Sequence, residues 1–253
     1  VPKFVRDIAN KDWKVNEDVT TLYTKWDIDT EVSKLPVSGN VGVQMVHTDQ
    51  SSTAFNVDGQ TCPGDVCPVT TVKGGKKYTD LLPSLNVAVD LGGDQKLRFG
   101  LGRQIARANI NDMRASFGFG VNTSGSFPIL KGDAGNPELK PFKANAIDIA
   151  YEKYFGTKAY FGAAFFHKDL RTYIVRQETP FDFTPYVTPG VTPLPTSGPF
   201  QNSPLGLLTQ PVNGSGGSLT GLEFAASLPF NMLAPALDGF GAFASYSNTS
   251  SSV

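Results

Sequence analysis

The residues best suited to contact a ligand lie in the stretch GRQIARANIND. Arg103 and Arg107 are followed there by Asn109, Asn111 and Asp112. Guanidinium groups pair with carboxylates and phosphates, and the shorter polar side chains suit the hydroxyl groups of a sugar. Arg107 and Asn109 could instead organise the loop that they begin. The stretch is therefore a candidate ligand-binding cluster at the junction of a strand and a loop.

Aromatic residues of a later segment are the second set of candidates. Tyr173, Tyr186 and Phe200 could stack on a sugar ring or on an aromatic ligand. The alternative is that they pack within their own loop. We add Tyr173 to the predicted ligand-binding residues.

The two cysteines, Cys62 and Cys67, stand close together in the stretch CPGDVC. A disulfide can close such a tight loop, and it would indicate an oxidising compartment. Two free thiols are the alternative. A zinc site needs further ligands at matching spacing, and His47 and His167 are far apart in the sequence. We predict a Cys62–Cys67 disulfide and no metal site.

The remaining sequence shows no catalytic or cofactor-binding pattern. The stretch TVKGGKKYT lacks the spacing of a P-loop, and GLGRQI falls one glycine short of a dinucleotide fingerprint. A net charge of -1 and a pI near 6.2 do not indicate a nucleic-acid partner. We therefore predict that the protein is not an enzyme and that it binds neither a cofactor nor nucleic acid.

Long strands with two different faces must position these residues. In SLNVAVDL, apolar residues at every second position alternate with polar ones, and GLEFAASLPF repeats the pattern. A strict period of two over such lengths is typical of strands that separate two environments. The fold class predicted is all-β. We expect about eight strands, near residues 16–31, 41–55, 78–92, 95–106, 143–155, 158–177, 218–230 and 239–248.

The connections between these strands are of two kinds. The short turns are KLPVSGN, GGDQ, GT and NMLAPALDG, and the long segments are residues 56–77, 107–142 and 177–217. Soluble domains rarely carry several long unstructured loops, whereas transmembrane β-barrels combine short periplasmic turns with long extracellular loops. No apolar run is long enough for a transmembrane helix, since prolines and polar residues interrupt the nearest candidate, residues 222–244. The sequence predicts an antiparallel transmembrane β-barrel in contact with outer-membrane lipid.

A barrel strand must turn apolar side chains toward lipid and can turn polar ones toward the lumen, because the bilayer offers no partners for polar groups. The side chains expected in the lumen are Lys96, Arg98, Asp148, Glu152 and Glu223. The aromatic residues expected beside the short turns, in a girdle, are Trp26, Phe155, Phe230 and Phe240.

Several stretches resemble the TonB-dependent outer-membrane receptors, in the branch common in Caulobacter- and Xanthomonas-like bacteria. An Asn-Pro-x-Leu-Lys-Pro loop leads into a strand, a short turn and a second strand with a Phe-x-Lys-Asp segment. YTDLLPSLNVAVDLGGDQKLRFGLGRQIARANINDM is similar to the preceding hairpin of the family, and GFGAFASYSNTSSSV to a later strand. The matching positions of the loop and of the second strand are Asn136, Pro137, Leu139, Lys140, Pro141, Phe166, Lys168 and Asp169.

The resemblance implies a nutrient receptor in the outer membrane of a Gram-negative bacterium, driven by the TonB complex through an N-terminal plug domain. Family members have barrels of about 22 strands. Residues 1–253 show no plug and no closing strands, so we expect part of a single barrel domain. The ligand expected is a scarce small molecule, either a carbohydrate or a siderophore, with a preference for an oligosaccharide.

Two alternatives remain open at this point. Eight strands can close into a small barrel of their own, which would suit an adhesin or a structural protein. A soluble β-sandwich or propeller-like binding module is the other, and it would have regular short loops.

Overall fold

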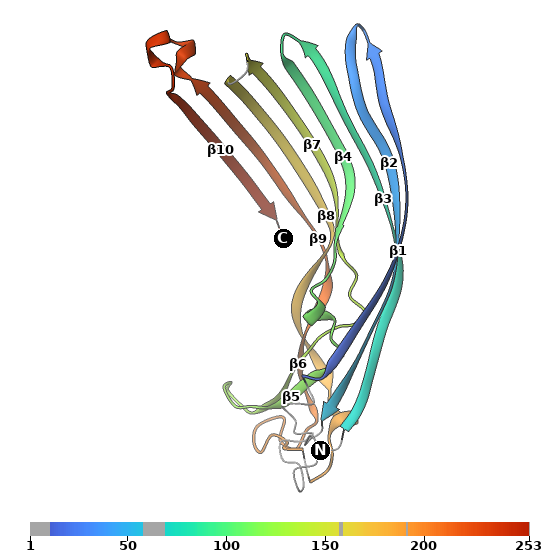
Figure 1. The fold of residues 1–253 in the computed structure, drawn as a ribbon. Helices are drawn as coiled ribbons and strands as arrows, with labels where there is room; N and C mark the ends of the chain where they lie inside the picture. Colours follow the sequence, from blue (N-terminus) through green and yellow to red (C-terminus); the bar gives the residue numbers. More distant parts are fainter. Residues whose placement is uncertain (1–10, 58–68, 157–158, 191, 253) are drawn as a thin grey trace.

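The computed structural model describes residues 11–57, 69–156, 159–190 and 192–252. These residues form one curved sheet of long strands with a folded segment on its concave side (Figure 1). The strands are β1 (Trp13–Val32), β2 (Leu35–Val57), β3 (Val69–Gly92), β4 (Gln95–Ala106), β5 (Phe117–Asn122), β6 (Ile129–Ala134), β7 (Phe142–Phe155), β8 (Ala159–Asp182), β9 (Leu205–Pro229) and β10 (Gly241–Ser252). Short 3-10 helices are η2 (Ile110–Met113), η3 (Thr184–Tyr186), η4 (Phe230–Met232) and η5 (Pro235–Leu237).

The strand order follows the chain, with one insertion. It runs β1-β2-β3-β4-β7-β8-β9, and β10 pairs with β9 at the far side. The hairpin β5–β6 joins the sheet because β6 pairs in parallel with residues 206–209 of β9. All other pairs are antiparallel. The predicted all-β, antiparallel architecture is therefore confirmed, and the parallel contact of β6 is an addition to it.

The eight predicted strands are all present, and several of them are longer than predicted. β2 continues to Val57 and β3 begins at Val69, while β8 continues to Asp182 and β9 begins at Leu205. Residues 107–142 contain η2, β5 and β6. Strand pairing, not local composition, decides where these strands end, so glycines and prolines within β3 and β9 did not mark loops.

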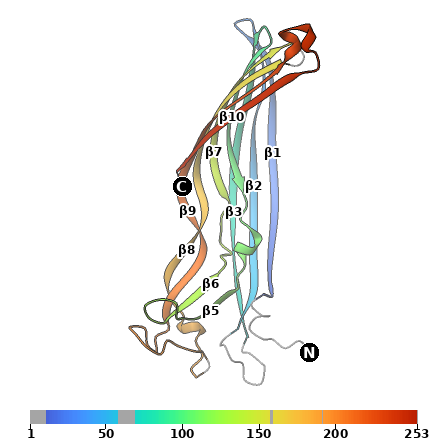
Figure 2. The same ribbon diagram turned by 90° about the vertical axis from the view of Figure 1, so that its left-hand side faces the viewer.

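Two of the turns at the opposite end are shorter than predicted. KLPVSGN is not a turn: Ser33 and Lys34 form the turn, with φ of 51° and 66°, and β2 begins at Leu35. Gly93 and Asp94 form the next turn with similar φ values of 56° and 60°. Consecutive left-handed residues suit the twist of a tight hairpin. Figure 2 shows the turns of the β1–β2, β3–β4 and β9–β10 hairpins at the upper end of the tilted strands, and the β5–β6 hairpin at the lower end.

One face of the sheet carries an exposed apolar band. Its members alternate along each strand and are paired across neighbouring strands, which places them on the convex side. They include Leu22, Val41, Met45, Leu81, Phe99, Leu101, Ile147, Ile149, Phe165, Leu222, Phe224 and Leu228. Such a surface needs a cover in water but suits the hydrocarbon of a bilayer. The band is the expected lipid-facing wall.

The band ends on its extracellular side at outward-facing polar pairs that link neighbouring strands. His47 Nδ1 lies 2.9 Å from Thr79 Oγ1, and His167 Nδ1 lies 2.7 Å from Thr220 Oγ1. Residues beyond these pairs on the same face, such as Asp49 and Lys77, form an ion pair of 2.7 Å. The wall therefore changes from apolar to polar within one residue pair.

The opposite, concave face is polar, as predicted. Cross-strand pairing puts Lys96 opposite Glu152 and Asp148 opposite Gly100, on the face away from the apolar band. Arg98 Nε donates to Glu152 Oε1 at 3.0 Å, and Glu223 lies on the same face of β9.

Phe155, Phe230 and Phe240 lie beside turns, as expected for a girdle. Trp26 does not: it pairs with Val41 well inside the hairpin and faces outward.

The two outer strands of the sheet do not pair with each other. β1 pairs only with β2 and β10 only with β9 in the part of the chain that the structure describes. The sheet is therefore open, and neither a closed eight-stranded barrel nor a two-sheet sandwich is formed. Within the described ranges, none of the helices has the length and apolar character needed to cross a membrane.

Candidate functional site

The segment between β4 and β7, residues 107–141, folds back against the concave face. We call it the infolded segment. It covers inward-facing positions of β2, so that Thr48, Gln50 and Ser52 are all at most 2% exposed. Ser52 Oγ accepts a hydrogen bond of 2.8 Å from the backbone N–H of Ala115. The extracellular half of the wall therefore has an inner layer, which the sequence did not predict.

Gln50 anchors this layer to β2. Its Nε2 donates to the carbonyl oxygens of Pro137 at 2.8 Å and of Leu139 at 2.7 Å. Its Oε1 accepts from the hydroxyl of Tyr78 at 3.1 Å. Gly74 on β3 makes room for the loop, because a Cβ there would lie 3.0 Å from Pro137 Cγ.

The same loop is tied to β9, on the far side of the curved sheet. Asn213 Oδ1 accepts from the backbone N–H of Lys140 at 2.9 Å, and its Nδ2 donates to the carbonyl of Lys140 at 2.8 Å. Asn136 Nδ2 donates to the carbonyl of Pro211 at 3.0 Å. The Asn-Pro-x-Leu-Lys-Pro stretch is therefore a bridge between β2 and β9 across the concave face. We call residues 136–141 the bridge.

The structure does not gather the predicted polar cluster into one site. Arg103 faces outward at the edge of the apolar band, where its Nε donates to Asn145 Oδ1 at 2.9 Å. Arg107 reaches Glu17 on β1, with 3.8 Å between Nη1 and Oε2. Asn109 caps η2 by accepting from the backbone N–H of Asn111 at 3.0 Å. Asn109 thus contributes to the structure of the infolded segment.

Asp112 and Tyr173 lie on opposite sides of β8. Asp112 belongs to the infolded segment, and its Oδ1 is 4.0 Å from Nη1 of Arg176 on the concave face. Tyr173 belongs to the other face and covers Gly214, where a Cβ would lie 3.1 Å from the ring. Tyr186 packs edge-on against Phe117, with 4.5 Å between ring centroids. The prediction that Asp112 and Tyr173 contact the same ligand remains a prediction, and their positions on opposite faces do not favour it.

Sequence inspection missed an ion-pair chain that fastens the infolded segment to β8. Arg176 pairs with Asp112 and, through Nη2, with Asp133. Arg114 Nη2 donates to the other oxygen of Asp133. Lys131 and Glu178 add a pair of 3.0 Å beside it. No local pattern marks these residues, because they come from three separate stretches of the chain.

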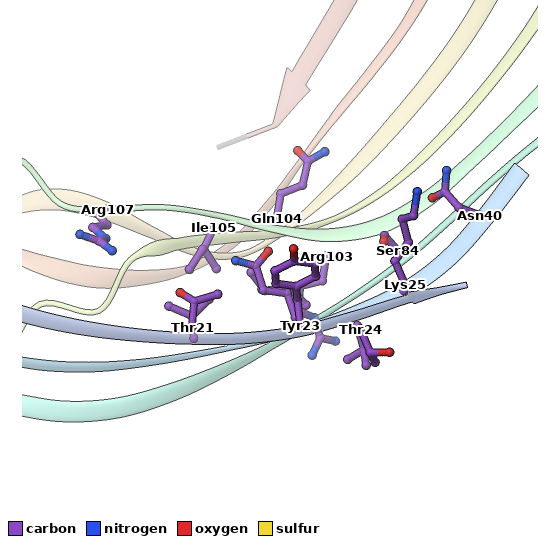
Figure 3. Close-up of a pocket in the computed structure, with 15 residues that line it drawn as sticks. Thr21, Tyr23, Thr24, Lys25, Asn40, Ser84, Arg103, Gln104, Ile105 and Arg107 are labelled. Atoms are coloured by element: carbon purple, nitrogen blue, oxygen red, sulfur yellow. The ribbon is translucent and has the colours of Figure 1, made fainter. Parts of the chain in front are cut away.

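The candidate site is a groove of about 840 Å³ on the concave side of β1–β4, beside the start of the infolded segment. Figure 3 shows Thr21 and Tyr23 on β1, with Gln104 and Arg107 across from them on and after β4. Most of its inward-facing side chains are neutral hydrogen-bonding groups. They are Thr21, Tyr23, Asn40, Gln44, Ser84 and Gln104.

The charges around the groove are largely balanced. Lys25 Nζ lies 2.8 Å from Asp27 Oδ1, and Arg107 is paired with Glu17. No Asp or Glu is among the described residues that line the groove. Lys25 and Arg107 line the groove, and their carboxylate partners Asp27 and Glu17 do not; the other inward-facing polar groups of the walls are hydroxyl, amide and aromatic. Sequence inspection assigned only Arg103 and Arg107 to this region and missed the neutral residues, which are unremarkable in a strand sequence.

Two further predictions concern cysteine and metal chemistry. Cys62 and Cys67 lie outside the described residues, so their disulfide stays a prediction. Among the described residues, no group of three or more His, Cys, Asp or Glu side chains is arranged to hold a metal ion.

Comparison with known proteins adds the family. The model of the family "TonB dependent receptor-like, beta-barrel" matches residues 5–253. A comparison with curated proteins finds no matching relative.

Similar crystal structures include the ferric enterobactin receptor of Pseudomonas aeruginosa, at 14% identity and a TM-score of 0.49. They also include the siderophore receptor PirA of the same organism, at 13% identity and a TM-score of 0.49. This chain is covered to 85% and 94%, but spans only 34% and 43% of those chains. The family match over nearly the whole sequence shows that the chain is an outer-membrane protein and belongs to the TonB-dependent receptors, within their β-barrel domain.

Proposed function

We propose that this chain forms part of the wall of a receptor that takes up a neutral oligosaccharide through the outer membrane with energy from TonB. The family supports the transport class. The observation that carries the ligand class is the groove, most of whose inward-facing side chains are amides, hydroxyls and Tyr23. Such groups donate to and accept from sugar hydroxyls, and an aromatic ring packs against the apolar face of a sugar.

A ferric siderophore that carries negative charge is favoured less by the same groove. It would need cations that are free to pair with it. Lys25 and Arg107 already have the carboxylates of Asp27 and Glu17 as partners, and Arg103 faces outward. Breaking these ion pairs would make the free energy of binding an anionic ligand less favourable.

Uptake by cells that express the full receptor tests both parts of the proposal. We expect labelled neutral gluco- or xylo-oligosaccharides to enter cells that contain TonB and not cells that lack it. Uptake of a ferric siderophore instead would keep the transport class and overturn the oligosaccharide. Uptake of any of these ligands that is unchanged without TonB would overturn energised transport.

Removing two amides of the groove should weaken binding without unfolding the wall. We expect the double variant Gln44→Ala/Gln104→Ala to bind the transported oligosaccharide about 5- to 150-fold more weakly, because each lost hydrogen bond contributes about 0.5–1.5 kcal/mol. Titration calorimetry on the detergent-purified receptor measures the change. Gln177→Ala is the matched control, since Gln177 is exposed on the outward face of β8. Equal affinity of the double variant and the control would remove the groove from the binding site.

A further inference from the structure

The turn between β9 and β10 is unlike the other described turns at its end of the sheet. Ser33–Lys34 and Gly93–Asp94 are tight and polar, whereas residues 230–240 form the two consecutive 3-10 helices η4 and η5. Figure 1 shows this turn as a compact knob at the end of the β9–β10 hairpin. We call residues 230–240 the apolar turn.

The side chains of the apolar turn are large, apolar and open to the surroundings. Met232 is 52% exposed, Leu233 67%, Leu237 40% and Phe240 68%. Asp238 is its one charged residue, and its Oδ1 accepts from Asn231 Nδ2 at 3.1 Å. Exposed apolar groups gathered in this way mark a surface that another apolar phase covers.

The backbone of the apolar turn pairs about half of its own polar groups. Leu233 and Ala234 donate to the carbonyl of Phe230, at 2.9 and 3.1 Å. Leu237 donates to the carbonyl of Ala234 at 3.0 Å, and Phe240 to that of Leu237 at 3.2 Å. A segment can leave water at low cost only when its N–H and C=O groups are paired within it. The apolar turn meets this requirement for part of its backbone, although it is not a regular helix.

The apolar turn also continues the lipid-facing band. The backbone N–H of Phe230 donates to the carbonyl of Phe240 at 2.8 Å, which extends the ladder in which Leu228 pairs with Ala242. Alternation along the strands then puts Phe230 and Phe240 on the outward side, with Leu228 and Phe224. A partner inside the barrel would contact the opposite face.

We propose that the apolar turn inserts into the interfacial region of the periplasmic leaflet and anchors this end of the wall in phospholipid. Its occupant is the lipid surface and not a protein, because it is continuous with the band that hydrocarbon already covers. The polar turns beside it stay in water. The end of the β9–β10 hairpin therefore enters the leaflet more deeply than the turns of the β1–β2 and β3–β4 hairpins.

Tryptophan fluorescence in vesicles tests the proposal. Leu233→Trp and Leu237→Trp are each made in the full receptor, reconstituted in phosphatidylethanolamine–phosphatidylglycerol vesicles with and without bromine on the acyl chains. Ser245→Trp is the control, because Ser245 faces the concave side of β10. We expect the quenching added by a tryptophan in the apolar turn to be at least about twice that added by the control. Correct folding is checked by the electrophoretic shift on heating.

Quenching no greater than that of the control at both positions would overturn the proposal. If only one position is quenched above the control, the insertion stands and that position identifies its deeper side. If the apolar turn instead binds a soluble periplasmic protein, it should stay in water in these vesicles, because that protein is absent. Its quenching should then be no greater than that of the control.

Discussion

Arginine in place of Phe224 should lower the free energy of unfolding by about 2–4 kcal/mol, the range found for a cation in the middle of a barrel's lipid face. Phe224 lies within the apolar band of β9, between Leu222 and Leu228, and is 41% exposed. A guanidinium there cannot keep its hydration, and no neighbouring carboxylate faces outward from the paired positions Ala163 and Tyr246. The measurement is a urea titration of the receptor folded into lipid vesicles.

Arginine at the next residue is the matched control. Ala225 faces the concave side and lines a hollow together with Glu152 and Glu223. These carboxylates and the water around them can accommodate a cation. We therefore expect Ala225→Arg to change the free energy of unfolding by less than about 1 kcal/mol, as for an exposed ion pair. Equal losses at the two positions would contradict the assignment of the two faces.

Leucine in place of Gln50 should detach the bridge from β2. The change leaves the carbonyls of Pro137 and Leu139 and the hydroxyl of Tyr78 without their partner in a site that is 2% exposed. Each buried group left unpaired costs about 1–3 kcal/mol, and we expect a total loss of about 2–4 kcal/mol after relaxation. Hydrogen exchange of residues 107–141 measures it: protection should fall there and persist in β2 and β3.

Two further variants make this prediction specific. Gln44→Leu makes the same change on the same face of β2, at an exposed position beside the groove, and should leave the exchange unchanged. Gln50→Glu keeps the size of the side chain but removes both donors at neutral pH. It should release the segment as Gln50→Leu does. Full protection in Gln50→Glu would mean that shape, and not hydrogen bonding, holds the bridge.

The sequence predicts the lipid-exposed part of the wall well because two solvents impose the pattern. Leu85, Val87 and Val89 must face hydrocarbon while their neighbours face the lumen, so alternation is strict and visible. Beyond the boundary marked by His47 and His167, both faces of a strand meet polar surroundings. Apolar and polar residues then no longer need to alternate, and the sequences of the β3 and β9 extensions resemble those of loops.

The candidate site was predictable only in part, for a related reason. Arg103 and Arg107 look equivalent in the sequence, yet Arg103 is still within β4 and faces outward, while Arg107 has left the strand and reaches Glu17. A single Gln in a strand, such as Gln44 or Gln50, carries no signal of what it will contact. The partners of these residues lie far away in the chain, so only the fold reveals them.

The bridge also implies an order of assembly. Hairpins such as β1–β2 and β3–β4 are joined by tight turns, so each can form from residues that are close in the chain. Gln50 and Leu139, by contrast, are separated by 89 positions, and Lys140 and Asn213 by 73. The bridge can therefore close only after both β2 and β9 stand in the sheet. We expect it to be among the last contacts to form, as the step that fixes the curvature of a wall already in the membrane.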